Sequence, residues 1–290
     1  MNGILNLNKP AGYTSFDCVA VLRKLTGEKK IGHTGTLDPQ ATGVLPVCIG
    51  KATRLLEFMD SAPKTYVCGC TLGLETDTQD IWGSVTCDRR PKIASVTRES
   101  VEEVLRCFEG EIEQKPPVFS AIKVNGKKLY EYAREGREVD IPVRRVTIHS
   151  IRLLDWNGPE EPFTFEVVCS RGTYVRSICH DLGQKIGCGA CMSSLVRTQT
   201  CGYAIEKAIS MDDLKQMTAE QIESLLDPPE TAVSHLPRLD LSEDQARLFC
   251  NGNPTWSQNL QLSDELQSVF YNNKLIGIIK DQIISKVFLD

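Results

Sequence analysis

The sequence predicts an α+β protein. Its 290 residues are 41% hydrophobic and 24% charged, which is ordinary for a globular chain. Some stretches have the two-residue alternation of strands, and others have the three- to four-residue apolar spacing of helices. They follow one another without the regular strand–helix–strand rhythm of a doubly wound sheet, so a mixed α+β arrangement is favoured. The length suits one large domain with a small appendage, or two ordinary domains.

The elements of the first half follow from apolar spacing and from cap and turn residues. An alternation at 4–7 that meets Pro10 and Gly12 predicts a strand and a turn. Ser100-Val101-Glu102-Glu103 has the capping-box pattern of a helix start. The other expected elements are a helix from Ser15 to about Thr26-Gly27, a strand at 44–49, a helix at 51–60, a strand at 64–73 and a polar turn at 76–80.

The second half is read in the same way. Asn125-Gly126 is a strong hairpin signal, and Gly187 ends a helix with apolar residues at Ile178, Leu182 and Ile186. The remaining expected elements are a short basic helix at 128–136, strands at 146–154 and 163–169, a capped helix at 242–250, and short strands at 269–271 and 275–279.

Membrane and secreted classes are not expected. No apolar run approaches the roughly 20 residues that span a bilayer, and residues 1–10 do not resemble a signal peptide. We therefore expect a cytoplasmic protein. The 12 cysteines are scattered and are expected to be free thiols. Cys188 and Cys191 form one C-x-x-C pair, which is half of a tetrahedral zinc site. No metal is expected, but a metal-dependent enzyme that uses the cysteines stays open as an alternative.

The net charge of −5 argues against a nucleic-acid partner, but its distribution does not. Residues 115–152 hold nine Lys/Arg and four Asp/Glu, whereas residues 211–290 hold six and thirteen. The basic excess therefore lies in the middle of the chain, where a polyanion could bind. A solvated basic face is the alternative interpretation of the same segment.

The loop at residues 32–43 is the most distinctive stretch. It reads Gly32-His33-Thr34-Gly35-Thr36-Leu37-Asp38-Pro39-Gln40-Ala41-Thr42-Gly43 and has no apolar period. Asp38 is its single carboxylate, fixed between turn residues, and Pro39 biases it away from helical backbone angles. The local alternative is that Asp38 caps a helix that starts at Pro39.

The string G-H-T-G-T-L-D-P-x-A-T-G resembles the catalytic loop of the tRNA pseudouridine-55 synthases, the TruB family. Further matches are K-P-x-G-x-[ST]-S at 9–15, K-x-Y at 64–66, residues 116–130, K/R-G-T-Y-x-R at 171–176 and S-x-L-x-R-T at 193–198. Together they extend over about residues 3 to 205. The resemblance implies a pseudouridine-synthase fold with a central mixed, largely antiparallel sheet flanked by helices. It also implies isomerisation of the uridine at position 55 in the T-arm loop of tRNA, without a cofactor.

The resemblance assigns three catalytic residues. Asp38 matches the catalytic carboxylate, which acts on a flipped-out uridine, and Arg176 matches the arginine that holds it. Tyr66 matches an aromatic that stacks on the base or serves as an acid or base. Two questions stay open: whether Asp38 attacks C1′ or the uracil ring, and whether Tyr66 or Asp38 removes the C5 proton.

The resemblance also implies contacts with RNA. His33 is expected against the RNA loop, Tyr174 as a second wall of the pocket, and Leu195 as a further contact. The expected phosphate contacts are Lys9, Lys64, Lys123, Lys127 and Lys128. Cys191 stands where the family usually has histidine, which puts a docking role of that histidine in doubt here.

The expected domains are a catalytic domain at 1–235, with a basic RNA-binding insertion at about 115–145, and a small PUA-like module at 236–290. The expected partner is the T-arm of tRNA, with no membrane and no obligate protein partner, and the protein is expected to be a monomer. A tRNA-folding chaperone, in which catalysis is incidental, is the alternative from the binding class. Substitution of Asp38 separates the two, because only catalysis depends on its charge.

Overall fold

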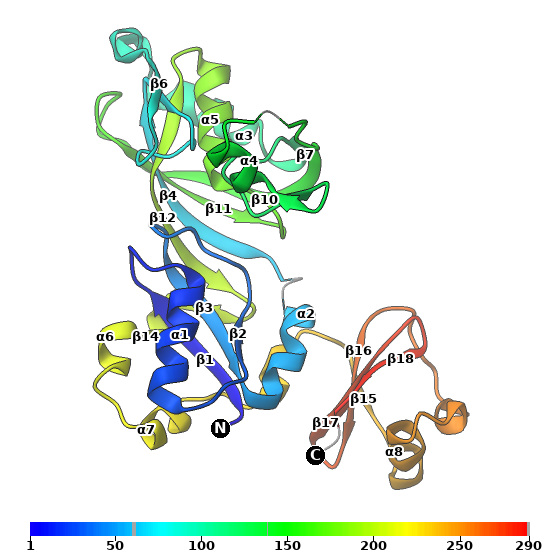
Figure 1. The fold of residues 1–290 in the computed structure, drawn as a ribbon. Helices are drawn as coiled ribbons and strands as arrows, with labels where there is room; N and C mark the ends of the chain where they lie inside the picture. Colours follow the sequence, from blue (N-terminus) through cyan, green and yellow to red (C-terminus); the bar gives the residue numbers. More distant parts are fainter. Residues whose placement is uncertain (60–61, 138, 289–290) are drawn as a thin grey trace.

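The computed structural model describes residues 1–59, 62–137 and 139–288 (Figure 1). A large body of helices around one sheet carries a smaller sheet module at its C-terminal side (Figure 1). This arrangement confirms the predicted α+β class. Asp60, the last residue of the helix expected at 51–60, lies outside the described residues.

The central sheet runs in the order β14-β1-β3-β12-β4-β11-β10-β7, with β2 beside β3 and β13 beside β12. It is largely antiparallel, with parallel pairs at β1–β14 and β3–β12. Its strands are β1 (Gly3–Lys9), β2 (Ile31–His33), β3 (Thr42–Ile49), β4 (Lys64–Leu72), β7 (Gly110–Gln114), β10 (Arg144–Asp155), β11 (Phe163–Cys169), β12 (Ala190–Thr200), β13 (Tyr203–Ala204) and β14 (Ile209–Ser210). The predicted mixed, largely antiparallel sheet is confirmed.

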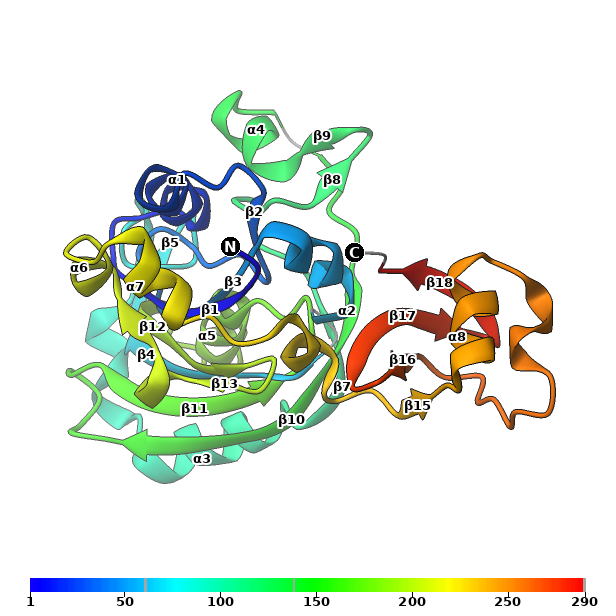
Figure 2. The same ribbon diagram turned by 90° about the horizontal axis from the view of Figure 1, so that it is seen from below.

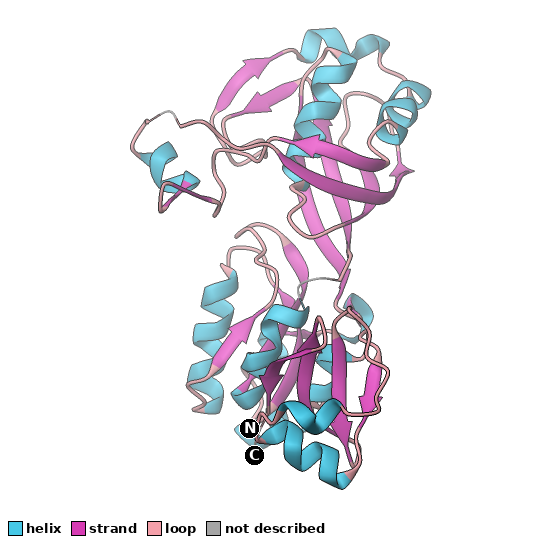
Figure 3. Cartoon of the chain, turned by 90° about the vertical axis from the view of Figure 1, so that its right-hand side faces the viewer, coloured by secondary structure: helices cyan, strands magenta, loops and turns pink. Residues whose placement is uncertain are grey.

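Helices pack on the two halves of this sheet (Figures 1 and 3). At one end, α5 packs on β12 and β4, and α3 packs on β10 and α5. At the other end, α1 packs on β2 and α7, and α6 packs on β1. The helices of the body are α1 (Ser15–Thr26), α2 (Leu56–Met59), α3 (Arg98–Arg106), α5 (Val175–Ile186), α6 (Met211–Leu214) and α7 (Ala219–Ser224). A hairpin of β5 (Leu74–Thr76) and β6 (Val85–Asp88) follows β4.

Two predicted helix starts are wrong. Thr14, not Ser15, is the N-cap of α1, and it forms a capping box with Asp17. Thr97, not Ser100, is the N-cap of α3, three residues before the predicted start. In both places a hydroxyl residue lies upstream of the predicted cap, and the upstream hydroxyl accepts the backbone hydrogen bond.

Strand β12 is absent from the prediction, although it lies between β3 and β4 in the sheet. Its pairing with β4 shifts register between Met192 and Ser194 and again between Arg197 and Gln199. Such bulges break the two-residue alternation that identifies a strand in a sequence. The strand carries Leu195, one of the expected RNA contacts, and Arg197.

The segment at about 115–145 stands away from the sheet (Figures 2 and 3). It holds β8 (Lys123–Val124) and β9 (Lys127–Lys128), joined by the predicted Asn125-Gly126 turn, and then α4 (Leu129–Arg134). A small apolar cluster of its own contains Ile122, Leu129 and Ile141. Residue 138 of this segment lies outside the described residues.

The C-terminal module has a second sheet in the order β15-β16-β17-β18 and its own core. Phe249 and Trp256 meet edge to face within that core, with ring centroids 5.1 Å apart. Its elements are β15 (Arg238–Asp240), α8 (Glu243–Cys250), β16 (Gln267–Tyr271), β17 (Lys274–Lys280) and β18 (Ile283–Val287). Residues 289–290, at the end of the predicted module, lie outside the described residues. Within the described ranges, no helix is long and apolar enough to cross a membrane.

Candidate active site

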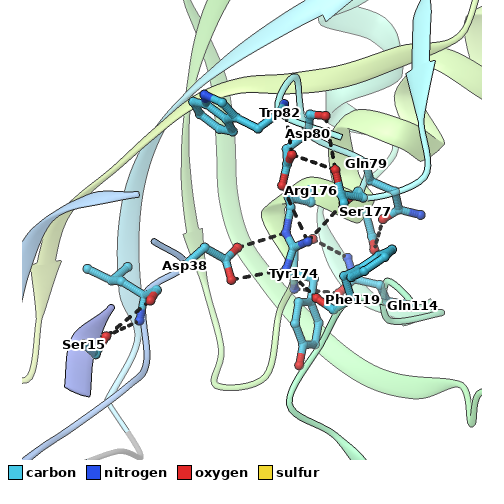
Figure 4. Close-up of polar contacts among 12 residues, drawn as sticks. Ser15, Asp38, Gln79, Asp80, Trp82, Gln114, Phe119, Tyr174, Arg176 and Ser177 are labelled. Carbon is cyan, nitrogen blue, oxygen red and sulfur yellow. Dashed lines mark hydrogen bonds and ion pairs between the residues drawn. The ribbon is translucent and has the colours of Figure 1, made fainter. Parts of the chain in front are cut away.

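Asp38 lies in a loop whose two neighbouring residues are both anchored. The amide of Leu37 donates to Oγ of Ser15 over 2.9 Å, and this hydroxyl donates back to the Leu37 carbonyl over 3.3 Å. On the other side, the Pro39 carbonyl accepts hydrogen bonds from Nζ of Lys9 and from the amide of Gly12. No helix starts at Pro39, so the capping alternative is wrong. The anchors hold the Asp38 carboxylate in a defined direction (Figure 4).

Arg176 binds Asp38 through two atoms. Its Nε lies 2.9 Å from Oδ2 of Asp38, and its Nη2 donates to Oδ1 over 3.3 Å. The arginine is buried, whereas 41% of the Asp38 side-chain surface is exposed. A planar guanidinium that contacts both oxygens fixes the carboxylate plane. The prediction that these two residues meet is therefore matched by their geometry.

The remaining donors of Arg176 are held by the surrounding protein. Its Nη1 donates to the Thr78 carbonyl over 3.0 Å, and its Nη2 donates to the Phe119 carbonyl over 3.1 Å. Asp80 Oδ2 lies 3.7 Å from Nη1 (Figure 4). Asp80 was not predicted as a site residue, because 96 positions separate it from Arg176 and no local pattern links them.

The electrostatics of Asp38 combine opposing effects. Burial of the carboxyl raises its pKa, and the positive charge of Arg176 opposes that rise. Asp80 adds a like charge that raises the pKa further, and Lys9 lowers it. Without the arginine charge the pKa of Asp38 would be higher, so the carboxyl would stay protonated up to a higher pH.

A hollow of about 90 Å³ opens beside Asp38. Tyr66, Tyr174 and Leu195 line it together with Asp38 and Arg176, so five residues that the sequence analysis selected meet at one place. Burial raises the pKa of the Tyr66 hydroxyl and of the Tyr174 hydroxyl. Two aromatic rings and an apolar side chain beside a carboxylate suit a flat, polar ring such as a nucleobase.

Gln114 fixes the backbone of Tyr174. Its side-chain amide accepts from the Tyr174 amide over 2.8 Å and donates to the Tyr174 carbonyl over 3.0 Å (Figure 4). Gln114 is buried on β7, at the edge of the sheet, and Tyr174 is the N-cap of α5. The same contacts therefore fix the start of the helix that carries Arg176.

Arg197 is a second residue that the sequence analysis did not assign. It lies directly opposite Tyr66 in the β4–β12 pairing, and it is fully buried. Its Nε donates to the Val44 carbonyl over 2.7 Å, while Nη1 and Nη2 have no hydrogen-bond partner among the described residues. Its charge lowers the pKa of Tyr66 and so opposes the effect of burial.

Two predicted phosphate contacts do not fit their positions. Lys9 is fully buried, and its Nζ donates to the carbonyls of Pro10, Tyr13 and Pro39. Lys64 is also buried, and its side chain packs against the loop at Gly35. Both lysines therefore support the Asp38 loop from inside, where a phosphate does not reach them. The motif spacing alone could not distinguish a buried lysine from an exposed one.

The other predicted RNA-contacting residues lie outside the hollow. His33 is half-buried at the end of β2. Lys123, Lys127 and Lys128 lie on the strands of the 115–145 segment, where Lys123 is exposed and the other two are half-buried. Lys127 forms an ion pair with Glu135, which offsets part of its charge.

Cys191 is buried on β12, directly opposite Thr71 in the sheet. Burial raises the pKa of its thiol to about 12. Within the described residues, no group of three or more His, Cys, Asp or Glu side chains is arranged to hold a metal ion. The thiol at this position therefore packs as a small apolar group.

Family comparisons agree with this geometry. The profile described as TruB family pseudouridylate synthase (N terminal domain) matches residues 23–175, and the profile described as tRNA pseudouridylate synthase B C-terminal domain matches residues 176–234. Proteins named tRNA pseudouridine synthase B are similar over most of this chain. The protein from Geobacillus thermodenitrificans is 46% identical over 87% of this chain and 85% of its own. The protein from Streptococcus sanguinis is 43% identical over 97% and 96%, respectively.

Solved structures also resemble this chain. A chain in a Cbf5-Nop10-Gar1 complex aligns with a TM-score of 0.73 at 28% identity, over 98% of this chain and 79% of that one. A chain of an H/ACA RNP bound to a substrate RNA containing 2′-deoxyuridine aligns with a TM-score of 0.73 at 25% identity, over 99% and 85%. The pseudouridine-synthase fold that the resemblance implied is confirmed. The chain belongs to the TruB family of pseudouridylate synthases, and it is an isomerase.

Proposed function

We propose that this protein converts the uridine at position 55 in the T-arm loop of tRNA to pseudouridine, with Asp38 as the nucleophile. The observation that carries the proposal is the two-atom contact between Arg176 and Asp38 beside the hollow lined by Tyr66 and Tyr174. The relatives named tRNA pseudouridine synthase B support tRNA as the substrate. The resemblance of the loop at 32–43 to the catalytic loop of the tRNA pseudouridine-55 synthases supports position 55 of the tRNA as the target.

The reaction needs few groups. The N1–C1′ bond of the uridine breaks, the uracil turns, and C5 forms the new bond to C1′. The C5 proton leaves and N1 gains a proton, so the isomerisation needs no redox cofactor. Attack of Asp38 at C1′ and attack on the uracil ring both fit a half-exposed carboxylate at this position.

Each residue around the hollow has a role in this proposal. Arg176 keeps Asp38 ionised and aimed, because its charge opposes the effect of burial on the Asp38 pKa. Tyr66 stacks on the uracil and accepts the C5 proton in this proposal. Burial raises the pKa of its hydroxyl, and the charge of Arg197, directly opposite Tyr66 in the sheet, opposes that rise and so favours the form that acts as a base. Tyr174 and Leu195 close the hollow around the base and exclude water, which would otherwise hydrolyse the intermediate.

The target uridine must leave its folded loop, at a cost of a few kcal/mol.

The 115–145 segment is the proposed RNA-binding insertion of a catalytic domain at 1–235. The ammonium of Lys128 and the guanidinium of Arg134 lie over the ring of Tyr130, 5.5 and 5.3 Å from its centroid. Such cation–aromatic clusters suit a nucleic acid backbone and its bases. The module at 236–290 is the proposed PUA-like domain.

We propose that the protein acts as a monomer in the cytoplasm, without an obligate protein partner. The experiment that tests the function is a pseudouridine map of unmodified tRNA after incubation with the pure protein and no added cofactor. We expect a single new pseudouridine at position 55. Modification elsewhere in the tRNA, or none at all, would contradict the proposal.

A further inference from the structure

Asp38 lines a second hollow as well as the one that contains Tyr66. This second hollow has a volume of about 280 Å³. Its walls include Asp38, Thr78, Asp80, Trp82 and Met192. Among the described lining residues, Asp38 is the one that the two hollows share. A nucleotide that reaches Asp38 from the first hollow therefore has a neighbouring space within the same site.

Trp82 provides the aromatic surface of this second hollow. Its side chain is half exposed, at 48%, although a ring of this size is usually buried when it serves packing. Figure 4 shows its indole projecting away from Asp80, on the side where Asp38 lies. An exposed indole face in a hollow beside the reacting carboxylate is a platform on which a base can stack.

The turn that carries Trp82 is joined to the catalytic pair. Oδ1 of Asp80 accepts the Trp82 amide over 3.2 Å, and Oδ2 of the same carboxylate lies 3.7 Å from Nη1 of Arg176. The carbonyl of Asp80 accepts from Oγ1 of Thr76 over 2.6 Å and from the amide of Gly83 over 3.2 Å. One carboxylate therefore fixes both the tryptophan backbone and the arginine that aims Asp38.

Contacts with the sheet hold the turn in place. The Ile81 amide donates to the Met192 carbonyl over 2.8 Å, and the Met192 amide donates to the Gln79 carbonyl over 3.1 Å. At Gly83, an added Cβ would lie 2.2 Å from Oγ1 of Thr78, so the turn closes tightly there. A platform held in this way loses little conformational freedom when it binds a ligand.

We propose that Trp82 stacks on the nucleobase next to the target uridine and so helps to select the RNA loop. The inference rests on the proposed function, because the target uridine occupies the first hollow in that account. The neighbouring nucleotide is linked to the target by one phosphodiester, so its base lies within reach of the second hollow. This hollow is lined largely by apolar surface, which suits a stacked base.

A protein partner is the alternative occupant of this surface. Ile81 and Val85 are exposed on the same hairpin, at 42% and 58%, but neither lines the hollow. The continuity of the hollow with Asp38 favours a part of the substrate over a separate protein. The alternative predicts that RNA kinetics do not depend on Trp82.

The test combines two variants of Trp82 and one control variant with three RNAs. The full-length proteins are wild type, Trp82→Ala and Trp82→Phe. The RNAs are a T-arm stem-loop and two versions that lack the base on the 5′ or the 3′ side of the target uridine. We expect Trp82→Ala to lower kcat/KM on the intact RNA roughly ten- to hundredfold, as the loss of one stacked base predicts. On one of the two abasic RNAs, wild type and Trp82→Ala should have the same kcat/KM, because the base on which Trp82 stacks is missing.

Trp82→Phe keeps an aromatic face and should stay within a few-fold of wild type. Val85→Ala is the matched control, because it shortens an exposed apolar side chain of the same hairpin outside the hollow. It should match wild type on all three RNAs. An equal loss for Trp82→Ala on every RNA would contradict stacking and indicate an effect through Asp80. No loss on any RNA would also overturn the inference and favour the protein partner.

Filter binding at fixed salt is measured in parallel with the same proteins and RNAs. The affinity of Trp82→Ala should show the same dependence on the neighbouring base. This readout decides the inference even if the wild-type protein forms no pseudouridine, an outcome that would contradict the proposed function instead. The two failures are therefore distinguishable.

Discussion

Arg176 and Asp38 are 138 positions apart in the chain, yet Nε of the arginine lies 2.9 Å from Oδ2 of the aspartate. The helix α5 brings the arginine to this place, and Gln114 fixes the start of that helix. Ser15 and Lys9 fix the loop of the aspartate from the other end of the sheet. The pair therefore joins the two halves of the catalytic body at the site of reaction.

The first prediction concerns the pH dependence that this pair imposes. Burial raises the pKa of Asp38, and Arg176 opposes the rise. Arg176→Gln removes the opposing charge, so the pKa of Asp38 should rise further. In the proposed mechanism the ionised form is the nucleophile, so the acid limb of the single-turnover rate should move to higher pH. We also expect a roughly hundredfold lower maximal rate, because the carboxylate loses its aim.

Arg176→Lys is the matched control, because it keeps the charge and loses the planar two-atom contact. Its acid limb should stay closer to that of wild type, while its rate stays low. An acid limb at the same pH in wild type and Arg176→Gln would show that another group sets the pH dependence.

The sequence predicts the residues of the site better than it predicts their contacts. Asp38 and Arg176 each lie in a string of several matching residues, whereas Tyr66 lies in the three-residue pattern K-x-Y and was selected because of the neighbouring matches. Asp80 lies beside Arg176 and Arg197 lies opposite Tyr66 only in the folded chain, and no local sequence pattern contains these contacts. The same limit explains why exposure was misjudged for two lysines, Lys9 and Lys64, since a motif does not say which side of a loop is solvated.

The elements show a similar division. The strand at 163–169 was predicted with its observed ends, because its residues alternate regularly between buried and half-buried positions. The strand at 190–200 was missed, because its bulges break that alternation. Sheet order could not be predicted from the sequence either, since the β3–β12 pairing joins segments far apart in the chain.

The second prediction separates two roles of Tyr66. Tyr66→Phe keeps the ring and loses the hydroxyl, whereas Tyr66→Leu loses both. We expect both variants to be slow, by roughly 10²–10⁴-fold, because in the proposed mechanism the Tyr66 hydroxyl accepts the C5 proton. Single-turnover rates at saturating enzyme measure this. A fast Tyr66→Phe with a slow Tyr66→Leu would leave stacking as the role of Tyr66, and wild-type rates in both would make it a packing residue.

The third prediction concerns the basic segment. Replacement of Lys123, Lys127 and Lys128 by alanine should weaken tRNA binding and reduce the slope of log affinity against log salt by up to about two. The rate at saturating tRNA should change little, since these residues lie outside the hollow. Binding titrations at several salt concentrations provide the measurement.

The control for this triple variant removes equal charge from another face. Arg98, Arg106 and Lys185 lie on α3 and α5, and Figure 2 shows α3 on the side of the body opposite α4. Their replacement by alanine should leave the salt slope unchanged. Equal slopes for wild type and both triple variants would mean that the 115–145 segment is a solvated face.

The fourth prediction concerns the buried ammonium of Lys9. Its pKa is lowered to about 8 from 10.5, mainly by burial. Between these values the unfolded chain binds more protons than the folded protein, so stability rises with pH. The free energy of unfolding of wild type, relative to Lys9→Met, should therefore rise by about 2–3 kcal/mol from pH 8 to 10.5. Urea denaturation across this range measures the difference.

Lys24→Met serves as the control, because Lys24 is an exposed residue on α1. Its difference from wild type should not depend on pH in this range. A wild-type advantage over Lys9→Met that falls as pH rises would contradict the buried position of the ammonium.

The central claim is that the charge of Asp38 does the chemistry, and Asp38→Asn tests it most directly. The asparagine keeps the size and the turn, so tRNA affinity should stay within a few-fold of wild type, and any chaperone activity should survive. Release of tritium from C5-labelled uridine in tRNA measures turnover. The account predicts no release above background from Asp38→Asn. Appreciable release from this variant would contradict it.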